Sequence, residues 1–587
     1  MRSETFVLLS ALLCTSTFAV QAEDTALDEL MASYWAEYLE ASPLAATVFG
    51  AEGARDTLDD LSPKARRARR NRLGAYEDHL GAVETHKLSD DGREQFNAFS
   101  WMLRQEAANL DQNTSLLTFN TLRGWQSMLP QILLSQPYVT QQHYEDLLKR
   151  YRQIERYARQ NVDLLEEAIR AGYTQPCDTL EGYSATISGY IADDPATSVY
   201  AFPFDNMPAT IPEADQQRLR DEAHALIRNV INPAYRSYAE FFEESYLPAC
   251  RKQAGLWSLP GGRDAYDQLI RFYTSLETDA ETVHELGLSE VARIQGEMQL
   301  VMQQVGFEGT LKAFLEYMAN DTSLYPRDEQ SYLNYIAWVT KSIDGLLPLY
   351  FSRLPTIPYG IKVVPAQTAP KTTTAYYQPG AENGTRAGNY FVNTYDLPSR
   401  PLYEIPALSL HEAVPGHHLQ ISMQQENKRL PAWRRNYYFH AFGEGWGLYA
   451  EKLGIEMGLY TTPYEHFGRL IYEIWRAARL VVDPGIHAKG WTRQQAIDYM
   501  LANTGLTEAN IIAEVDRYIT YPAQATAYKH GELKILELRA RAEAALGDDF
   551  DLREFHTALL EGGSMPLVVL DARVDRWIGT VSNGAEE

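Results

Sequence analysis

The sequence predicts a mainly α-helical protein with one small β-sheet in its second half. Apolar residues recur at three- and four-residue spacing through most of the first 350 positions, as in Leu27–Leu39, which is typical of amphipathic helices. Short apolar runs at 360–364 and 388–393 predict strands, and Asn383-Gly384 between them is a turn signal. Helical patterning resumes at Leu402 and continues to the end of the chain.

The N-terminus has the features of a secretion signal. Arg2 supplies a positive start, Phe6–Val20 is an apolar run, and Val20-Gln21-Ala22 resembles a cleavage site. We therefore predict a signal peptide at 1–22 and a soluble, exported protein in the periplasm or outside the cell. Lipid attachment is the alternative, but Cys14 lacks the preceding small residue that this processing needs. No later stretch approaches the roughly 20 apolar residues of a membrane helix, so no membrane span is expected.

The mature chain is long enough for two or three lobes. We predict a mainly helical N-terminal lobe at 23–350 and a second lobe, which carries the chemistry, at 351–587. Composition changes little along the chain and no low-complexity linker interrupts it. One continuous domain at 23–587 is therefore the alternative.

Charge and cysteine content narrow the possible partners and the compartment. The net charge is −25, which argues against nucleic acid and anionic membrane surfaces, because both require a basic footprint. Only Cys177 and Cys250 lie outside the predicted signal peptide. In an oxidising compartment they either form a disulfide or remain as two buried thiols.

The most informative motif is His411–His418, HEAVPGHH. A His followed at once by Glu, with another His further on, is the core of zinc-hydrolase sites. There the imidazoles bind the metal and the Glu acts as general base toward a zinc-bound water. In the usual HExxH form one helix presents both rings, whereas here His417 and His418 follow at wider spacing. On a regular helix six residues turn through about 600° and seven rise about 10.5 Å, so neither ring would meet that of His411.

Pro415 and Gly416 allow the chain to leave helical geometry inside this motif. Proline removes a backbone donor and disfavours helical angles in the residue before it, and glycine accepts unusual angles. We therefore predict a helix that carries His411 and Glu412, then a bulge, and then a second histidine returned to the metal. The alternative is a chance combination of common residues.

A zinc hydrolase needs a third protein ligand, usually a Glu from a later helix, and keeps one coordination position open. Glu444 and Glu451 lie in an aromatic stretch, where an ionised carboxylate is costly unless it is paired or bound to a metal. We predict Glu444 as the ligand, because Gly443 and Gly445 allow another backbone to approach it. Glu451 would then hold a His ring or an Arg. The reverse assignment and two ordinary surface acids are the alternatives.

The last part of the chain contains groups suited to binding a substrate. A tyrosine hydroxyl can stabilise an oxyanion, so Tyr521 and Tyr528 join Glu412 as candidate catalytic residues. Arginine binds a terminal carboxylate well, and a peptide can add as a strand to a sheet edge, for which the segment ending at Asn393 is placed. The alternative for this segment is a hairpin that packs against the rest of the protein. The alternative for each polar group is a structural hydrogen bond or a place on the surface. The candidate substrate-binding residues are Arg476, Arg479, Arg517, Asn393 and His418.

Taken in order, these motifs resemble the bacterial family named domain of unknown function 885. The resemblance covers nearly the whole mature chain and includes four further phrases, at 255–262, 284–287, 475–483 and 522–529. That family is similar to helical gluzincin metallopeptidases such as thimet oligopeptidase and angiotensin-converting enzyme. This implies a two-lobed helical fold with a deep cleft for short peptides. Their motif is strict HExxH, from which this sequence departs.

The same resemblance bears on the choice between the two adjacent histidines. The pair Gly416-His417 resembles the Gly-His that closes the motif in the oligopeptidases, which implies that His417 rather than His418 is the ligand. The predicted cofactor is one Zn²⁺ per chain, and the predicted partner is an oligopeptide substrate.

Three functions compete at this point. The first is a secreted zinc metallopeptidase that acts on short peptides. The second is a zinc hydrolase of another amide or of an ester, and the third is a binding protein that holds peptides without cutting them. Glu412 favours an enzyme, because a non-catalytic relative commonly loses its general base.

Overall fold

The computed structural model follows most of the chain. It describes residues 4–51, 53, 55–366, 369, 373–382 and 386–584. The first helix, α1 (Glu4–Ala41), is described by its backbone throughout and by its side chains from residue 23 onward. The signal peptide at 1–22 therefore stays a prediction. Beyond it the predicted apolar stripe is confirmed, because Leu27, Met31 and Tyr34 are buried.

The chain divides into two compact units. One comprises Met1–Ala265 with Ile519–Tyr521, and the other comprises Tyr266–Tyr518 with Pro522–Glu587. This division lies earlier than residue 350, where the sequence placed it, because the helices that follow Tyr266 pack with the C-terminal part of the chain. The mainly helical fold class is confirmed. The deep cleft of a zinc-peptidase-like architecture stays a prediction.

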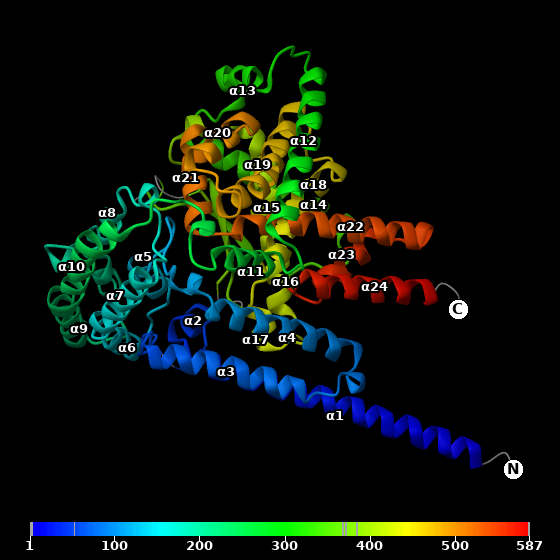
Figure 1. Cartoon of the computed structure of the whole chain (residues 1–587), viewed down its shortest axis with the longest axis horizontal. Helices are drawn as coiled ribbons and strands as arrows, with labels where there is room; N and C mark the ends of the chain where they lie inside the picture. Colours follow the sequence, from blue (N-terminus) through cyan, green and yellow to red (C-terminus); the bar gives the residue numbers. More distant parts are fainter. Residues whose placement is uncertain are drawn as a thin grey trace. The chain divides into compact units, whose positions relative to one another are not determined.

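The first unit is built from helices (Figure 1). They pack around a tyrosine-rich core. The Tyr200 and Tyr235 hydroxyls lie 2.7 Å apart, and Tyr235 donates to the Gln126 carbonyl, so these buried hydroxyls are satisfied. After α1, its helices are α2 (Pro43–Val48), α3 (Pro63–Gly81), α4 (Asp90–Asp111), α5 (Trp125–Leu134), α6 (Gln141–Tyr151), α7 (Ile154–Ala171), α8 (Tyr183–Ser188), α9 (Glu213–Leu226) and α10 (Asn232–Phe241), and α11 (Gly262–Thr274) spans the division between the units.

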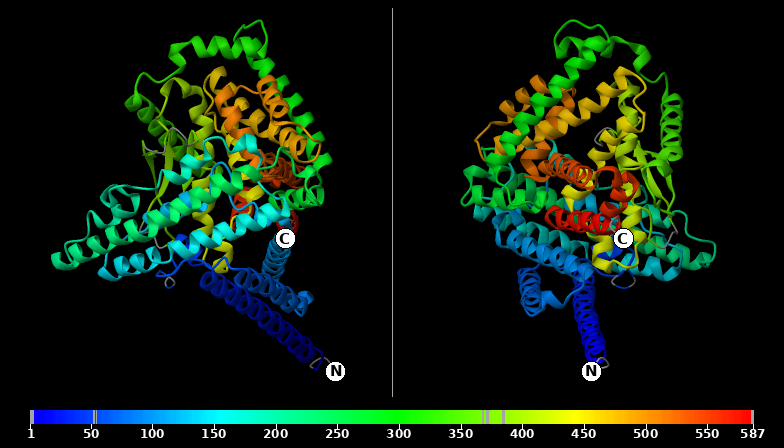
Figure 2. Two further views of the ribbon diagram at one scale, coloured as in Figure 1. Left: turned by 60° about the vertical axis from the view of Figure 1, so that its left-hand side comes forward. Right: turned by 90° about the vertical axis from the view of Figure 1, so that its right-hand side faces the viewer.

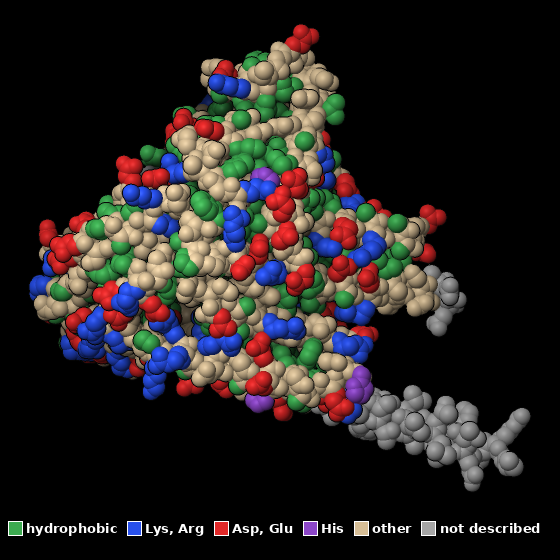
Figure 3. Space-filling model, viewed as in Figure 1, with side chains coloured by type: hydrophobic (Ala, Val, Ile, Leu, Met, Phe, Trp, Pro, Cys, Tyr) green, Lys and Arg blue, Asp and Glu red, His purple; other side chains and the backbone are tan. Residues whose placement is uncertain are grey.

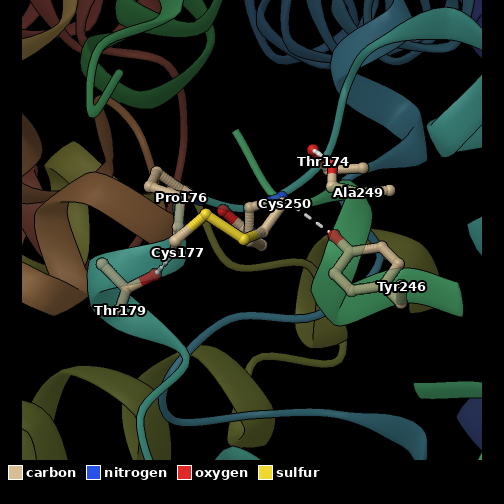
Figure 4. The surroundings of a disulfide bond; sticks show 8 residues. Thr174, Pro176, Cys177, Thr179, Tyr246, Ala249 and Cys250 are labelled. Carbon is tan, nitrogen blue, oxygen red and sulfur yellow. Dashed lines mark hydrogen bonds between the residues drawn. A yellow bond between two sulfur atoms is a disulfide. The ribbon is translucent and has the colours of Figure 1, made fainter. Parts of the chain in front are cut away.

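A disulfide joins Cys177 to Cys250 in the first unit, which decides between the two alternatives left open by the sequence (Figure 4). The backbones on both sides of the bond are also linked, because the Cys177 amide donates to the Arg251 carbonyl and the Arg251 amide to the Gln175 carbonyl. The Tyr246 hydroxyl accepts from the Gln175 amide. A structural disulfide fits an oxidising compartment.

We expect the Cys177→Ser/Cys250→Ser variant to lose stability in the first unit. The bond closes a sequence separation of 73 residues. In the chain-entropy account a loop of this size contributes about 4 kcal/mol by restricting the unfolded chain. Urea unfolding of oxidised wild type, reduced wild type and the variant measures this. Reduced wild type should match the variant, and an unchanged midpoint would contradict the expectation.

The second unit contains the remaining helices and the sheet (Figure 1). Its helices are α12 (Ala280–Gln304), α13 (Leu311–Asn320), α14 (Glu329–Tyr350), α15 (Ile405–Glu412), α16 (His417–Glu426), α17 (Ala432–Asn436), α18 (His440–Glu456), α19 (Pro463–His487), α20 (Arg493–Asn503), α21 (Glu508–Thr520), α22 (Ala527–Leu546), α23 (Leu552–Leu560) and α24 (Leu567–Gly584), of which α21 ends in the first unit.

Two close helix contacts hold this unit together (Figures 1 and 2). Helices α12 and α19 meet at Gly287, where a Cβ would lie 2.7 Å from Leu480 Cβ. Helices α18 and α22 meet at Gly445 and Gly531, and a Cβ on Gly531 would lie only 1.8 Å from the Ala441 carbonyl oxygen. Only glycine permits such an approach, and it fixes α18 against α22.

The sheet has three strands in the order β1-β3-β2. Strand β1 (Tyr359–Val363) pairs in parallel with β3 (Gly388–Val392), from Tyr359 opposite Gly388 to Val363 opposite Val392. Strand β2 (Ala375–Gln378) pairs antiparallel with β3. The two predicted strands are confirmed, and β2 was not predicted. The predicted turn at Asn383-Gly384 lies outside the described residues.

The position of β3 corrects one prediction. This strand is central and pairs on both sides, so the segment that ends at Asn393 has no free edge to which a peptide could add. The edges of the sheet are β1 and β2.

Charged side chains of both signs lie on the surface (Figure 3). The face in Figure 3 shows acidic and basic side chains interspersed. Several form surface pairs, such as Arg70 Nε with Asp111 Oδ1 at 2.8 Å. None of the helices within the described residues is long and apolar enough to span a membrane.

Candidate metal centre

The helix that carries His411 is interrupted where the sequence predicts the bulge. Helix α15 ends at Glu412 and α16 begins at His417. The link folds tightly over the end of α15, since a Cβ on Gly416 would lie 1.9 Å from the His411 carbonyl oxygen. The Trp446 indole donates to the Pro415 carbonyl at 2.7 Å and holds this link against α18. As a result the His411 and His417 rings meet with centroids 4.7 Å apart.

Three side chains converge at this point. The ligand atoms of His411, His417 and Glu444 all lie within 4.8 Å of one another. Glu444 Oε2 lies 3.7 Å from His411 Nε2 and 3.6 Å from His417 Nε2. Ligands of a tetrahedral zinc ion with bonds of roughly 2.0–2.2 Å stand about 3.4 Å apart. The structure thus brings together the three predicted ligands at separations that fit one ion.

The electrostatics of this group favour a positive charge. Burial opposes protonation of His411, but the Glu444 and Glu451 carboxylates outweigh it and raise the pKa of His411 to about 10. Burial also opposes ionisation of Glu444, yet His411 and His417 hold its pKa well below the usual range. Carboxylates that stabilise a proton on His411 in this way also stabilise a metal cation at the same place. The residues present therefore fit a metal ion.

Glu451 lies behind His411 and not at the point of convergence. Its Oε1 is 2.8 Å from His411 Nδ1, which leaves Nε2 directed at Glu444. The ring fits there because residue 447 is glycine, whose Cβ would lie 2.5 Å from His411 Cε1. Arg476 Nη2 lies 3.8 Å from the same Glu451 oxygen. The geometry favours Glu444 over Glu451 as the ligand and gives Arg476 a partner inside the protein.

We expect Glu451→Ala to lower zinc affinity by about 10–100-fold without abolishing binding, because outer partners of a ligating His act at this level. Glu451→Gln keeps a hydrogen-bond acceptor for His411, so its zinc affinity should fall less than that of Glu451→Ala. Glu456→Ala is the matched control, since Glu456 lies on the same helix but is 44% exposed and pairs with Arg539. Competition titrations with a zinc chelator give the affinities. Complete loss of zinc in Glu451→Ala would make Glu451 a ligand.

Glu412 and Tyr438 lie next to the triad, and Tyr528 lies near Tyr438. Glu412 is partly exposed, and its carboxylate has no hydrogen-bond partner among the described residues. Tyr438 donates to Glu444 Oε1 at 3.2 Å. Burial is the main cause of the raised pKa of Tyr438, and the charges of Glu444 and Glu412 add to it, so the hydroxyl keeps its proton. Tyr528 is partly exposed and its hydroxyl accepts from Arg517 Nη2 at 3.4 Å.

Tyr438 was not predicted from the sequence. Its contact with Glu444 requires the chain to turn before α18, and the available signal was Gly443, where a Cβ would lie 2.3 Å from the Tyr438 ring. Tyr521, the other tyrosine predicted as catalytic, belongs to the first unit, and its catalytic role stays a prediction.

The three predicted arginines differ in surroundings. Arg479 is 2% exposed, donates to Glu514 and to the Tyr518 hydroxyl, and stacks on aromatic rings. Arg476 is also buried. Both guanidinium groups have partners inside the protein, and their contact with a substrate stays a prediction. Arg517 also pairs with Glu514, at 3.3 Å, but it keeps 14% of its side chain exposed beside Tyr528, so it is the most accessible of the three candidates for substrate contact.

Asn393 and His418, the other two predicted substrate-binding residues, are both buried, and their contact with a substrate stays a prediction. Asn393 is fully buried and its amide donates to the Ala369 and Thr373 carbonyls, so it shapes the loop next to the sheet. His418 is 2% exposed, and its Nδ1 lies 2.9 Å from the Tyr377 hydroxyl. Burial lowers the pKa of His418 to about 4. It is a neutral residue that joins α16 to the sheet.

Fold and site together define a mainly helical protein with a largely buried group of two His and one Glu that is suited to a metal ion. The family described as "Bacterial protein of unknown function (DUF885)" matches residues 43–574, and the chain belongs to that family. None of the curated proteins matches the sequence.

Two solved structures are similar to this chain. One from Colwellia psychrerythraea is 28% identical, with a TM-score of 0.90 over 95% of this chain and 99% of that chain. Another, from Shewanella oneidensis, is 18% identical, with a TM-score of 0.69 over 93% of this chain and 99% of the other, and it shows the fold alone. Each is described as a "putative lipoprotein", and the second also as of unknown function.

Proposed function

We propose that this protein is an exported zinc-dependent metallopeptidase that hydrolyses short peptides. Its centre would hold one zinc ion through His411, His417 and Glu444. The observation that carries the proposal is the convergence of these three side chains within 4.8 Å, directly beside Glu412. Two His and one Glu are the ligand set of catalytic zinc sites that keep a position open. The likeness of the motif to gluzincin peptidases points to the same reaction.

A bound zinc ion supplies Lewis acidity, which polarises a carbonyl group and makes water easier to deprotonate. Glu412 then takes the proton of the attacking water and returns it to the leaving amine. Its carboxylate suits this role because it is partly exposed and makes no hydrogen bond to another described residue. Glu451 keeps His411 oriented, since it accepts at Nδ1.

The neighbouring donors can serve the substrate. The Tyr438 and Tyr528 hydroxyls are the candidates to donate to the oxyanion that develops on the substrate carbonyl. Arg517, beside Tyr528, is the candidate for the terminal carboxylate of a peptide. Hydrolysis of another amide or of an ester would use the same groups.

Two observations support export. Cys177 and Cys250 form a disulfide, and the solved structure from Colwellia psychrerythraea, which is 28% identical, is described as a "putative lipoprotein".

The test is metal analysis of purified protein, followed by digestion of a mixed peptide library read by mass spectrometry. We expect one zinc per chain and a consistent position of cleavage, both absent after chelation and restored by zinc. A panel of esters and non-peptide amides identifies the second function if peptides stay intact. Zinc-loaded protein that cleaves none of these substrates would overturn the proposal, and peptide binding without cleavage would support the binding function.

A further inference from the structure

A short connection precedes α22 and carries residues that face Arg517. Gln524 Oε1 accepts from Arg517 Nη2 at 2.5 Å, and Tyr528 lies one residue into α22. We call residues 523–528 the arginine arm. Its position decides where Gln524 and the Tyr528 hydroxyl stand relative to Arg517.

The arm begins at a backbone conformation that alanine rarely adopts. Ala523 has φ +65°, in the left-handed region. This conformation costs energy for any residue with a Cβ, so the surroundings must hold it. The Ala523 carbonyl accepts from both the amide and the hydroxyl of Thr526, at 3.0 and 2.7 Å. Its amide points the other way, into the protein.

Asp483 of α19 accepts a hydrogen bond from the Ala523 amide. Its Oδ1 accepts from the Ala523 amide at 3.0 Å and from the Tyr266 hydroxyl at 2.6 Å. Asp483 is fully buried, and its Oδ2 has no hydrogen-bond partner among the described residues. Burial raises the pKa of Asp483 to about 7, although both donors lower it. Burying a carboxylate costs free energy. Here the buried Asp483 carboxylate binds the amide of Ala523, the residue with the strained backbone.

We propose that Asp483 is a positioning residue, which fixes the left-handed turn at Ala523 and thereby places Gln524 and Tyr528 against Arg517. It does not touch the metal group or the substrate. The inference rests on the proposed function for its kinetic consequence only. Its structural consequence does not depend on activity: the bond from the Ala523 amide to Asp483 holds the arginine arm in place.

The experiment compares Asp483→Ala, Asp483→Asn, and Asp483→Ala combined with Ala523→Gly. Glycine adopts a positive φ without strain, so the second change should restore the turn even though the carboxylate is absent. Asparagine keeps an acceptor oxygen and should behave almost as wild type. Tyr266→Phe is the matched control, because it removes the other donor to Oδ1 and leaves the bond to Ala523.

Amide hydrogen exchange is read first, since it needs no substrate. We expect exchange in residues 521–530 to become about tenfold faster in Asp483→Ala, the size that one lost hydrogen bond gives. The rest of the chain, and this segment in Tyr266→Phe and in the rescued variant, should change little. Unchanged exchange at 521–530, or a change spread over the whole second unit without rescue by Ala523→Gly, would overturn the inference.

Kinetics then separate this inference from the proposed function. With zinc content unchanged, Asp483→Ala should raise KM about tenfold for a peptide with a free C-terminal carboxylate and hardly for its amidated form, with kcat kept. An equal rise in KM for both peptides would contradict the proposal that Asp483 acts on substrate binding through Arg517. If zinc-loaded wild type cleaves neither peptide while the exchange pattern appears, the proposed function fails and the positioning role of Asp483 stands.

Discussion

Glu412→Gln should bind zinc as wild type does and lose about 10²–10⁴ in turnover, the usual contribution of a general base. The amide is nearly the same size as the carboxylate, but it cannot take a proton from water. Glu412 lies at the end of α15 and donates no atom to the group formed by His411, His417 and Glu444, so the ligands stay intact. Metal analysis and kcat on the peptide found in the library digest measure the two effects.

The same carboxylate-to-amide change at Glu456 is the control, since that residue is largely exposed and pairs with Arg539. Glu456→Gln should keep zinc and turnover. A Glu412→Gln variant that retains more than about a third of wild-type turnover would remove Glu412 from the role of base. Loss of zinc in the same variant would mean that Glu412 supports the ligands instead.

The local parts of the site could be predicted because they depend on backbone chemistry. Proline and glycine at 415 and 416 exclude a continuous helix, and the structure breaks the helix there. The preference for Glu444 followed from the same kind of reasoning, since glycines beside an acid signal a close approach. Glu444 indeed lies within reach of both rings.

The surroundings of the predicted substrate-binding residues could not be predicted, because they depend on contacts across the fold. Arg479 and Arg476 have the side chains expected of carboxylate binders, but Glu514 and Glu451 already occupy them. A sequence shows that an arginine is present and not whether a distant acid meets it. Asn393 follows the same pattern, because its partners come from a loop twenty or more residues earlier in the chain.

The boundary between the two compact units could not be read from the sequence for a related reason. Composition does not change at residue 265, so no sequence signal marks the point where helices begin to pack with the C-terminal part. The contact of α12 with α19 depends on Gly287, whose meaning is visible only when the facing Leu480 is known.

The two adjacent histidines should respond in opposite ways to removal. His417→Ala takes away a ligand atom that lies 3.6 Å from Glu444 Oε2, so we expect zinc affinity to fall by more than about 100-fold, beyond the range of outer partners. His418→Ala removes a buried ring that lies 4.6 Å, centroid to centroid, from the Tyr359 ring. It should keep one zinc per chain.

The cost of His418→Ala should appear in stability. Its Nδ1 lies 2.9 Å from the Tyr377 hydroxyl and 3.3 Å from Ser422 Oγ, and both groups would lose this partner. A buried polar group left without its partner costs about 1–3 kcal/mol, and the cavity adds to that. Activity should fall only as far as the junction of α16 with the sheet loosens.

Metal content and thermal unfolding, measured on both variants, decide the assignment. Circular dichroism checks that each is folded, since a variant that fails to fold would lose zinc for the wrong reason. Zinc retained in His417→Ala and lost in folded His418→Ala would reverse the ligand assignment. Such a result would also require the α16 backbone to turn, because adjacent side chains on a helix point about 100° apart and one of them already packs against the sheet.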